Sequence, residues 1–448
     1  MGPSAFIGPF LVPLAEHERM TDTSPAARGR SPLSPGVRRR RRLLTTISVA
    51  MTTALAVGVG IVALVFRDLD EGIARSEFEL PFIDDLDEDS GEQNILIMGL
   101  DSRVDQNGKA LPDEIYHALH AGDASVGGYN ANVLILLHIP EDRSQAVGIS
   151  IPRDDYVEIA GAPLGVTHAK IKEAYGLTLQ ARLNEQVNQG RTSDAEGYQE
   201  ARAAARQAQI ETISRFLGDV RIDHFVEVTM AGFYYVAEAV APITVCVNEA
   251  TQDDHSGANF TAGVQELGPE EALAFVRQRR DTAGGPFLTD LDRSRRQQAF
   301  IAALAEKLRE QTTLINPHTV MTLMEVTKNH VAMDSGFDVL SFLRTAHNVS
   351  RSGVSFVTLP IAGFDTIQGA SVNIVDLDEV RSVVAAALDG TYFAPDDGAD
   401  DPGAPHDQSG ADNDDEPGAG SDDEDEPRVA VYETWDEPMR AGALPCVN

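Results

Sequence analysis

Six short and almost uninterrupted apolar runs place the strongest constraint on how this chain folds. Runs of about four to eight such residues are typical of strands that are buried on both faces of a sheet. Segments with helical spacing lie between them, notably 198–217 and 229–240. The alternation predicts one large α/β/α sandwich domain with a central mixed sheet over residues 94–393. The expected strands are NILIMGL (94–100), NVLILLHI (132–139), AVGISI (146–151), HFVEVT (224–229), ITVCV (243–247) and VSFVTLP (354–360).

A second constraint is the segment 43–66, which has 24 residues and no charge. This length suits a helix that spans a bilayer. The arginines Arg38–Arg42 precede it, so the positive-inside rule places residues 1–42 in the cytoplasm, as a basic disordered tail, and the rest of the chain outside. The alternative is a cleaved signal peptide, but its apolar core is usually shorter, and we find no convincing cleavage site before Arg67. We therefore expect a single-pass protein of the cell membrane with an extracytoplasmic domain.

The remaining segments are expected to be appendages of this domain. Residues 67–93 are rich in Asp and Glu without periodicity, which predicts a short extracytoplasmic stalk. Residues 394–427 are acidic and of low complexity, which predicts a disordered linker. The final segment, 428–448, regains apolar residues and contains the only tryptophan, Trp435, so we expect it to dock on the domain. The formal net charge of −34 argues against nucleic acid as a partner, because phosphate neutralisation requires a basic surface.

The two cysteines, Cys246 and Cys446, each begin the tripeptide Cys-Val-Asn. The repetition has two explanations, and the sequence does not decide between them. One is coincidence. The other is a single disulfide that ties the C-terminal segment to the domain, which requires an oxidising compartment.

The segment 276–300 contains six arginines and no lysine, although the chain is acidic overall. GPEEALAFVRQR predicts a helix with Pro269 in its first turn and with Arg277 and Arg279 toward its end. A second helix follows, for which Asp292 is the expected N-cap. One face of this helix changes from apolar residues to Arg and Gln at its first turn. That face consists of Arg293, Arg296, Gln297, Phe300, Ile301 and Leu304.

Guanidiniums gathered beside a helix N-terminus suit a phosphate or pyrophosphate group. The alternative is a solvated surface in which the arginines pair with the many acids. We expect the second arrangement for Arg280 and Arg295, which lie off the shared face.

Acids and basic residues also follow two of the predicted strands. NILIMGL is followed by Asp101 and Arg103, and GISIP by Arg153 and Asp154. Ligand sites of α/β sheets gather at the carboxyl ends of strands. These two ends therefore predict a divalent cation held against a diphosphate. Lys170 in THAKIKEAYG is a further candidate, although a lysine is more often solvated than functional.

Together these segments resemble the LytR–CpsA–Psr family of bacterial cell-wall assembly, over residues 94–310. The most specific motifs are SIPRD and the pair RQR and DRSRRQQ. Supporting motifs are NILIMGLDSR, AKIKEAYG and DHFVEV. The segment DHSGANFTAG resembles actinobacterial members of the family. The resemblance implies a membrane-anchored phosphotransferase that moves a glycopolymer from a polyprenyl (pyro)phosphate carrier to peptidoglycan as a phosphodiester. The lipid chain would lie in an apolar tunnel within the domain.

The resemblance also implies residue roles, with Mg²⁺ as the cofactor. Asp101 would bind Mg²⁺, and Asn132 stands where many members have a second metal-binding aspartate. Asparagine offers only a neutral carbonyl oxygen, which puts metal affinity in doubt. Asp154 is a candidate base for the acceptor hydroxyl, as is the metal-site acid. The expected contacts to the pyrophosphate are Arg103, Lys170, Arg293, Arg296 and Gln297, together with Arg153, Arg277 and Arg279, which are also expected to be catalytic.

Three other functions fit parts of the pattern. One is a weakly active or inactive binder of lipid-linked cell-wall polymer, which the Asn132 departure would explain. Another is hydrolysis of polyprenyl pyrophosphate, with water as the acceptor. The third, a transcription regulator, is disfavoured because the 42-residue N-terminal tail has no room or pattern for a helix-turn-helix. The donor polymer is left open among arabinogalactan, teichoic acid and capsular polysaccharide.

Overall fold

A computed structural model describes most of the predicted domain and the C-terminal segment. The predicted cytoplasmic tail, the membrane helix and all but the first residue of the acidic linker lie outside the described residues. Within the described part of the chain, no helix combines the length and the apolar character needed to cross a bilayer. The described residues are 73–80, 91–120, 122, 128–142, 145–191, 194–309, 326, 328–338, 353–394 and 428–448.

The domain is built on a central mixed sheet, as predicted, and this sheet has seven strands. The strand order is β1-β12-β7-β2-β3-β4-β13, and the pairs β1–β12, β7–β2 and β4–β13 are parallel. Five of the six predicted strands lie in this sheet. Its members are β1 (Ala74–Ser76), β2 (Gln93–Leu100), β3 (Ala131–Ile139), β4 (Ala146–Ser150), β7 (His224–Thr229), β12 (Val331–Asp334) and β13 (Val354–Thr358).

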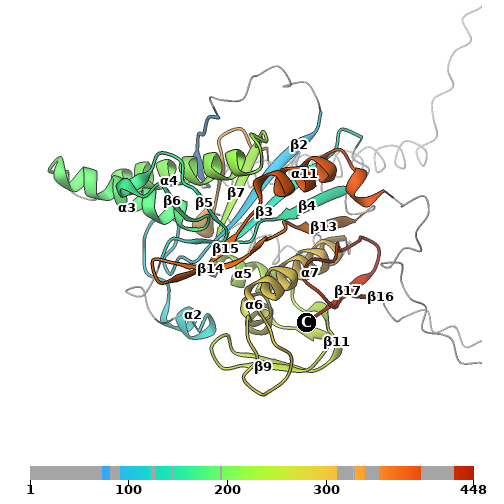
Figure 1. Ribbon diagram of the computed structural model, residues 1–448. Coiled ribbons are helices and arrows are strands. Elements are labelled where there is room, and N and C mark those ends of the chain that lie inside the picture. Colours follow the sequence, from blue (N-terminus) through green and yellow to red (C-terminus); the bar gives the residue numbers. More distant parts are fainter. Residues whose placement is uncertain are drawn as a thin grey trace, which may run out of the picture. The chain divides into compact units, whose positions relative to one another are not determined.

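Helices cover both faces of the sheet and bury a hydrophobic core on each (Figure 1). On one face, α3, α4 and α11 pack against strand residues such as Leu96 and Phe225. On the other, α5, α6 and α7 contribute to a core that contains Phe275 and Phe300. The helices are α2 (Asp113–Ala118), α3 (Glu173–Asn188), α4 (Ala195–Phe216), α5 (Met230–Val240), α6 (Pro269–Arg277), α7 (Asp290–Arg309) and α11 (Leu377–Leu388), with 3-10 turns η3 (Pro163–Gly165) and η4 (Thr391–Phe393).

The register of the sheet brings three strand ends to one edge. In the antiparallel pair β2–β3, Leu100 lies opposite Ala131. In the antiparallel pair β3–β4, Ile135 lies opposite Ser150. The end of β2, the start of β3 and the end of β4 therefore lie together, and the polar residues next to these ends face a common region.

One predicted strand belongs to a different sheet. ITVCV forms β8, which pairs with β11 on one side and with β17 of the C-terminal segment on the other. The apolar character of this segment predicted a buried strand, but it did not indicate which other strands it pairs with. The four strands of this sheet are β11 (Gly263–Leu267), β8 (Ile243–Val247), β17 (Leu444–Val447) and β16 (Val429–Val431).

The C-terminal segment thus docks on the domain through backbone pairing. Cys246 of β8 lies opposite Cys446 of β17, and a disulfide joins them. Of the two explanations for the repeated tripeptide, the structure contains the disulfide.

The fold begins earlier in the chain than Asn94. Ala74–Ser76, part of the predicted stalk, form β1 at the edge of the sheet. The Nη1 atom of Arg75 donates to the backbone oxygens of Asp334 and Phe337 at 2.7 and 2.9 Å. Such a short strand in an acidic context gives no periodic signal. The remaining strands form two-stranded pairs, β5 (Tyr156–Glu158) with β6 (His168–Lys170), β9 (Thr251–Asp253) with β10 (Ala258–Phe260), and β14 (Gly363–Ile367) with β15 (Ala370–Ile374).

Candidate active site

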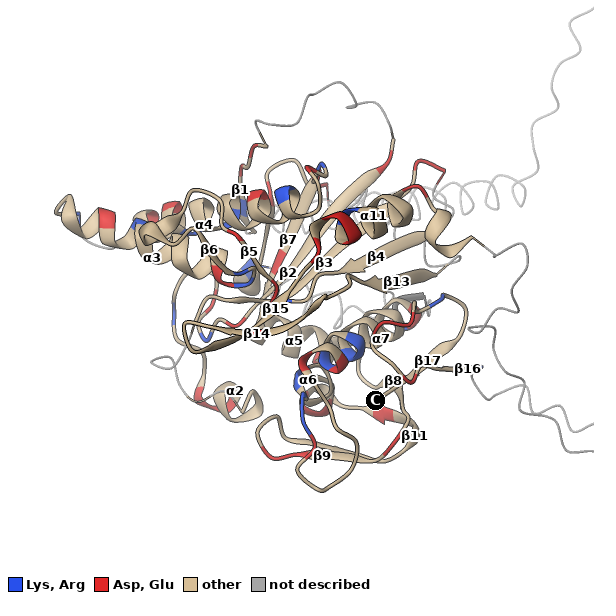
Figure 2. Cartoon of the chain, in the orientation of Figure 1, with Lys and Arg blue, Asp and Glu red and all other residues tan. Residues whose placement is uncertain are grey.

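A cavity of about 670 Å³ lies where the three strand ends meet α6 and α7. Seven of its lining side chains are Lys or Arg and two are Asp, a local excess of positive charge in a chain of net charge −34. Figure 2 shows the same gathering of Lys and Arg on α7 and at the end of α6. The charged lining residues are Asp101, Arg103, Arg153, Lys172, Asp253, Arg277, Arg279, Arg280 and Arg293.

The rest of the lining is largely apolar and comes mainly from the bodies of β2, β7, α5, α6 and α7. The rings of Phe233 and Phe300 are packed with their centroids 4.7 Å apart. The cavity therefore offers cationic groups to an anion and an apolar wall to a hydrocarbon chain. The apolar lining residues are Ile97, Met98, Leu100, Val133, Val228, Met230, Phe233, Val236, Leu273, Val276, Phe300, Ile301 and Leu304.

Arg153 is placed by the strand register. Continuing the β3–β4 pairing beyond Ser150 puts Arg153 opposite Asn132, and its Nη1 donates to Asn132 Oδ1 at 2.6 Å. Its Nε and Nη2 donate to the two carboxylate oxygens of Asp290 at 3.1 and 2.9 Å. This bidentate pair fixes the plane of the guanidinium. Asp290, which had no predicted role, orients the arginine that the sequence placed at the site.

Asp154 faces cations and does not line the cavity. Its Oδ1 lies 2.6 Å from Lys172 Nζ and 3.1 Å from Lys170 Nζ, and its Oδ2 lies 3.8 Å from Arg153 Nε. Burial alone would raise the pKa of this carboxyl, but the hydrogen bond and charge of Lys172, with Arg153 and Lys170, lower it to about 2. A general base works best with a pKa near the working pH, so this environment makes Asp154 a poor base.

The lysine that lines the cavity is Lys172, not the expected Lys170. Lys170 ends β6, whereas Lys172 lies two residues further along, between the other strand ends. Its N–H donates to the carbonyl of Arg153 at 3.3 Å, and its carbonyl accepts from the N–H of Ala131 at 3.0 Å. Both lysines belong to AKIKEAYG, and only the backbone pairing shows which one reaches the site.

The end of α6 presents three arginines to the cavity. Arg277 is the last helical residue, and its Nη1 donates to the backbone oxygen of Leu119. Burial lowers the pKa of Arg277, although nearby Asp101 opposes this. Gln278 takes an extended conformation that ends the helix. Both Arg279 and Arg280 then line the cavity, so Arg280 belongs to the site and is not simply the solvent-facing residue we expected.

The helix α7 begins with a capping box. The Thr289 hydroxyl accepts from the N–H of Asp292 at 3.4 Å, and the Asp292 carboxylate accepts from the N–H of Thr289 at 2.7 Å. Thr289 is therefore the N-cap, and Asp292 is its partner in the first turn. One residue further on, Arg293 Nη2 donates to Asp290 at 2.8 Å, and burial lowers the pKa of Arg293 to about 10. The predicted face of α7 lines the cavity through Arg293, Gln297, Phe300, Ile301 and Leu304.

Arg296, expected to bind the pyrophosphate, does not line the cavity. It is fully buried, with its Nε donating to the backbone oxygen of Asn448 and its Nη1 to Gln278 Oε1, both at 2.7 Å. Arg295, expected to face solvent, is also buried, and its Nη2 donates to the Thr434 carbonyl at 2.9 Å. Both corrections have one cause. The C-terminal segment packs on α7, and no local pattern in the sequence reveals that contact.

The expected Mg²⁺ ligands, Asp101 and Asn132, both line the cavity. Asp101 presents a carboxylate, with Arg103 Nη1 lying 3.8 Å from its Oδ1. The Asn132 oxygen already accepts from Arg153, and the described residues hold no group of three His, Cys, Asp or Glu arranged for a metal. Mg²⁺ is commonly held by one or two carboxylates, waters and substrate phosphates, so these residues fit a site of that kind with Asp101 as the charged ligand.

Comparison with known proteins identifies the family. The model described as the LytR_cpsA_psr family matches residues 70–387. The chain is 34% identical over 361 residues to the cell wall biosynthesis protein LcpA of Corynebacterium glutamicum, an alignment that covers 80% of this chain and 67% of LcpA. It is 26% identical over 291 residues to the polyisoprenyl-teichoic acid–peptidoglycan teichoic acid transferase TagU of Oceanobacillus iheyensis, which covers 65% of this chain and 73% of TagU.

Among solved structures, the LytR-Csp2A-Psr enzyme from Actinomyces oris matches with a TM-score of 0.46 and 17% identity, over 70% of this chain and 95% of that one. The family match alone spans most of the described domain, including the strand ends and both arginine-bearing helices. The sequence resemblance is therefore confirmed, and this chain belongs to the LytR-CpsA-Psr family, whose relatives named above include a cell wall biosynthesis protein and a teichoic acid transferase.

Proposed function

We propose that this chain is a membrane-anchored phosphotransferase that moves a glycopolymer from a polyprenyl pyrophosphate carrier to peptidoglycan. The observation that carries the proposal is the cavity, in which seven cationic side chains adjoin an apolar lining. A polyprenyl pyrophosphate has the same two parts, an anionic head and a hydrocarbon chain. The name of TagU describes a transfer to peptidoglycan by that relative.

In this reaction an acceptor hydroxyl of peptidoglycan attacks the phosphorus that bears the glycopolymer. One P–O bond forms, the P–O bond to the carrier breaks, and polyprenyl phosphate leaves. Arg153, Arg277, Arg279 and Arg293 surround the proposed phosphate position and stabilise the negative charge that builds there. Arg153 and Arg293 are held in advance, because both donate to Asp290.

Asp101 is the residue that we assign to hold Mg²⁺, with the substrate phosphates among the other ligands. A bound Mg²⁺ would supply further charge neutralisation at the diphosphate. Asn132 has a different role in this proposal. Its side-chain oxygen accepts from Arg153 and so orients a guanidinium toward the phosphates.

A base other than Asp154 must take the proton from the attacking hydroxyl of peptidoglycan. Asp253 lines the cavity but is buried, and its two oxygens accept from the N–H of His255 at 3.0 Å and from the hydroxyl of Ser256 at 2.9 Å. His255 is exposed and lines the same cavity. Because Asp101 is assigned to the metal, we assign the proton acceptor to His255.

The proposal places the domain outside the cytoplasm, with residues 43–66 as its membrane anchor and lipid-linked glycopolymer and peptidoglycan as its partners. The disulfide between Cys246 and Cys446 supports this location, because such bonds persist in oxidising compartments. The basic run Arg38–Arg42 supports the orientation.

The test uses the full chain in lipid vesicles, with a lipid-linked glycopolymer, peptidoglycan and Mg²⁺. Wild type should form a glycopolymer–peptidoglycan phosphodiester, detected by mass spectrometry. Arg277→Gln should lower kcat about 10²-fold or more, as expected when a group that stabilises transition-state charge is removed. The control is Arg182→Gln, an exposed arginine paired with Glu185 at 3.0 Å, and it should keep wild-type activity.

The outcomes separate the alternatives. Lipid binding without product would favour a carrier, and Asn132→Asp would then be tried for restored turnover. Release of phosphate without linked glycopolymer would show hydrolysis. Equal activity of wild type and Arg277→Gln would contradict the proposed site.

A further inference from the structure

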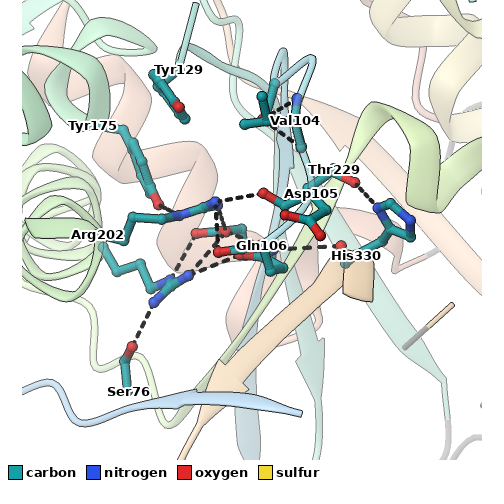
Figure 3. Close-up of polar contacts among 12 residues, drawn as sticks. Ser76, Val104, Asp105, Gln106, Tyr129, Tyr175, Arg202, Thr229 and His330 are labelled. Carbon is teal, nitrogen blue, oxygen red and sulfur yellow. Dashed lines mark hydrogen bonds and ion pairs between the residues drawn. The ribbon is translucent and has the colours of Figure 1, made fainter. Parts of the chain in front are cut away.

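Arg202 of α4 is fully buried and joins segments that are far apart in the sequence (Figure 3). Its Nε donates to the hydroxyl of Tyr175 at 3.0 Å. Its Nη1 reaches the backbone oxygens of Asp105 and Gln106 at 3.5 and 3.4 Å. Its Nη2 pairs with the carboxylate of Glu227 on β7. One guanidinium on α4 thus connects helix α3, the central strand β7 and the loop that follows β2.

Three tyrosine rings also surround this guanidinium. The ring centroids of Tyr129, Tyr175 and Tyr198 lie 5.9, 6.0 and 5.7 Å from its central carbon, within the range of cation–π contacts. The hydroxyl of Tyr198 accepts from Arg202 Nη1 at 3.4 Å, and it lies 2.9 Å from the hydroxyl of Tyr129. Tyr129 is therefore tied to Arg202 both through its ring and through Tyr198.

Each segment that Arg202 contacts carries residues of the candidate site. Gln106 follows the loop that begins with Asp101 and Arg103 after β2. Tyr129 comes three residues before Asn132 at the start of β3, and Tyr175 comes three residues after Lys172. Each of these three segments contributes residues to the cavity lining, namely Asp101 and Arg103 after β2, Asn132 in β3, and Lys172 just before α3. A single buried side chain therefore contacts all three segments.

Arg202 is itself held firmly. Glu227 accepts from Arg202 and from Arg206 Nε, the latter at 2.9 Å, and from Gln106 Nε2 at 2.9 Å. Burial alone would raise the pKa of Glu227, but Arg206 and Arg202 lower it to about 2, so the carboxylate stays ionised at neutral pH. Arg206 Nη2 also donates to Gln106 Oε1 at 3.1 Å. A buried network in which the members satisfy one another is rigid, and it transmits that rigidity to the loops bound to it.

We propose that Arg202 is a positioning residue for the transfer reaction. It acts by holding the segments of Asp101, Asn132 and Lys172 in one fixed arrangement, without touching the substrate. The inference rests on the proposed function of the cavity. Misplacement of reacting groups by about 1 Å can lower a rate about 100-fold, so loosening these segments should be visible in kcat.

The test removes single hydroxyls from the network and leaves Arg202 in place. Tyr175→Phe and Tyr129→Phe are compared with Tyr432→Phe, a buried control in the C-terminal segment whose hydroxyl accepts from the N–H of Arg440 at 2.9 Å. The full chain is assayed for transfer at a temperature where thermal unfolding shows all forms folded. Both network variants should lower kcat about tenfold. KM for the lipid-linked donor should change less than about threefold, because these variants keep Lys172 itself and because Arg277, Arg279 and Arg293 lie at the end of α6 and on α7, outside this network.

Hydrogen exchange of the backbone amides supplies a second readout that needs no activity. In both network variants, amides of 101–106 and 129–132 should exchange faster than in Tyr432→Phe. Wild-type kcat with unchanged exchange in those segments would overturn the inference and show that Arg202 serves stability alone. A failure of the proposed function can be told apart from a failure of this inference. If the proposed function is wrong, wild type will show no transfer activity. The hydrogen-exchange result would still decide whether Arg202 orders these segments. If Tyr175→Phe does not fold, Tyr129→Phe decides both readouts.

Discussion

Asp154→Asn should destabilise this domain in a manner that depends on pH. The carboxyl has a folded pKa of about 2 against an ordinary value of 3.8, because the nearby cations favour its charged form. A group with a lowered folded pKa adds stability that is fully present above its unfolded pKa and is lost as the pH falls through its folded pKa. The stabilisation is therefore complete near pH 7 and disappears between about pH 4 and pH 2.

The magnitude follows from the shift. Each pKa unit corresponds to about 1.4 kcal/mol, so the difference between 3.8 and about 2 amounts to roughly 2 kcal/mol for this largely buried carboxyl. Asparagine has the shape of the protonated acid, so the variant should differ little from wild type once the wild-type carboxyl is protonated.

The assay is guanidinium unfolding of wild type and Asp154→Asn from pH 7 down to pH 2. The free-energy difference should be roughly 2 kcal/mol at pH 7 and should shrink toward zero at the acid end. Glu185→Gln, which removes an exposed ion pair, is the control and should cost less than about 1 kcal/mol at every pH. A difference that does not change with pH would refute the reasoning, and so would complete loss of transfer in a folded Asp154→Asn, since we assign no proton transfer to this residue.

Three further predictions concern Lys172, Cys446 and Asn132. Lys172→Met should weaken binding of inorganic pyrophosphate about tenfold, whereas Lys170→Met, which alters a lysine outside the cavity lining, should change it less than about twofold; titration calorimetry measures both, and equal effects would contradict the assignment. Cys446→Ser should lower the free energy of unfolding by about 2–4 kcal/mol, because the disulfide closes a loop with a sequence separation of 200; an unchanged denaturation midpoint would show that the bond adds nothing. Asn132→Asp should raise the affinity for Mg²⁺, because it adds a charged oxygen to the cavity that Asp101 also lines; a transfer assay over a range of Mg²⁺ concentrations measures the shift, and no shift would show that position 132 serves only to orient Arg153.

Local patterns in the sequence predicted most of the fold. Continuous apolar runs identified β2, β3, β4, β7 and β13, and helical spacing identified α4 and α5. The errors concern partners that are remote in sequence. ITVCV was correctly a strand, but its neighbour β17 lies almost 200 residues later, and a three-residue strand such as Ala74–Ser76 has too few positions to show a period.

The sequence predicted only part of the site, because the remaining site residues also depend on contacts with segments that are remote in sequence. The 3.6-residue period placed Arg293 and Gln297 at the cavity, but the same face included Arg296, which the docked C-terminal segment buries elsewhere. Choosing between Lys170 and Lys172 required the backbone pairing around β3. Nothing in the Ala-rich pattern of α4 distinguished Arg202 as a residue that joins two loops and the first turn of α3, because its role depends entirely on contacts made across the fold.

The central claim is that one cavity holds both the diphosphate and the lipid chain of the donor. Photocrosslinking tests it most directly, with the full chain and a polyprenyl pyrophosphate-linked donor that carries a photoreactive group in its hydrocarbon chain. Mass spectrometry should find the label on apolar lining residues of α5 and α7, such as Phe233 and Phe300, and Arg277→Gln should reduce that labelling. Labels that fall mainly outside the cavity lining, or labelling that is unaffected by Arg277→Gln, would contradict the account.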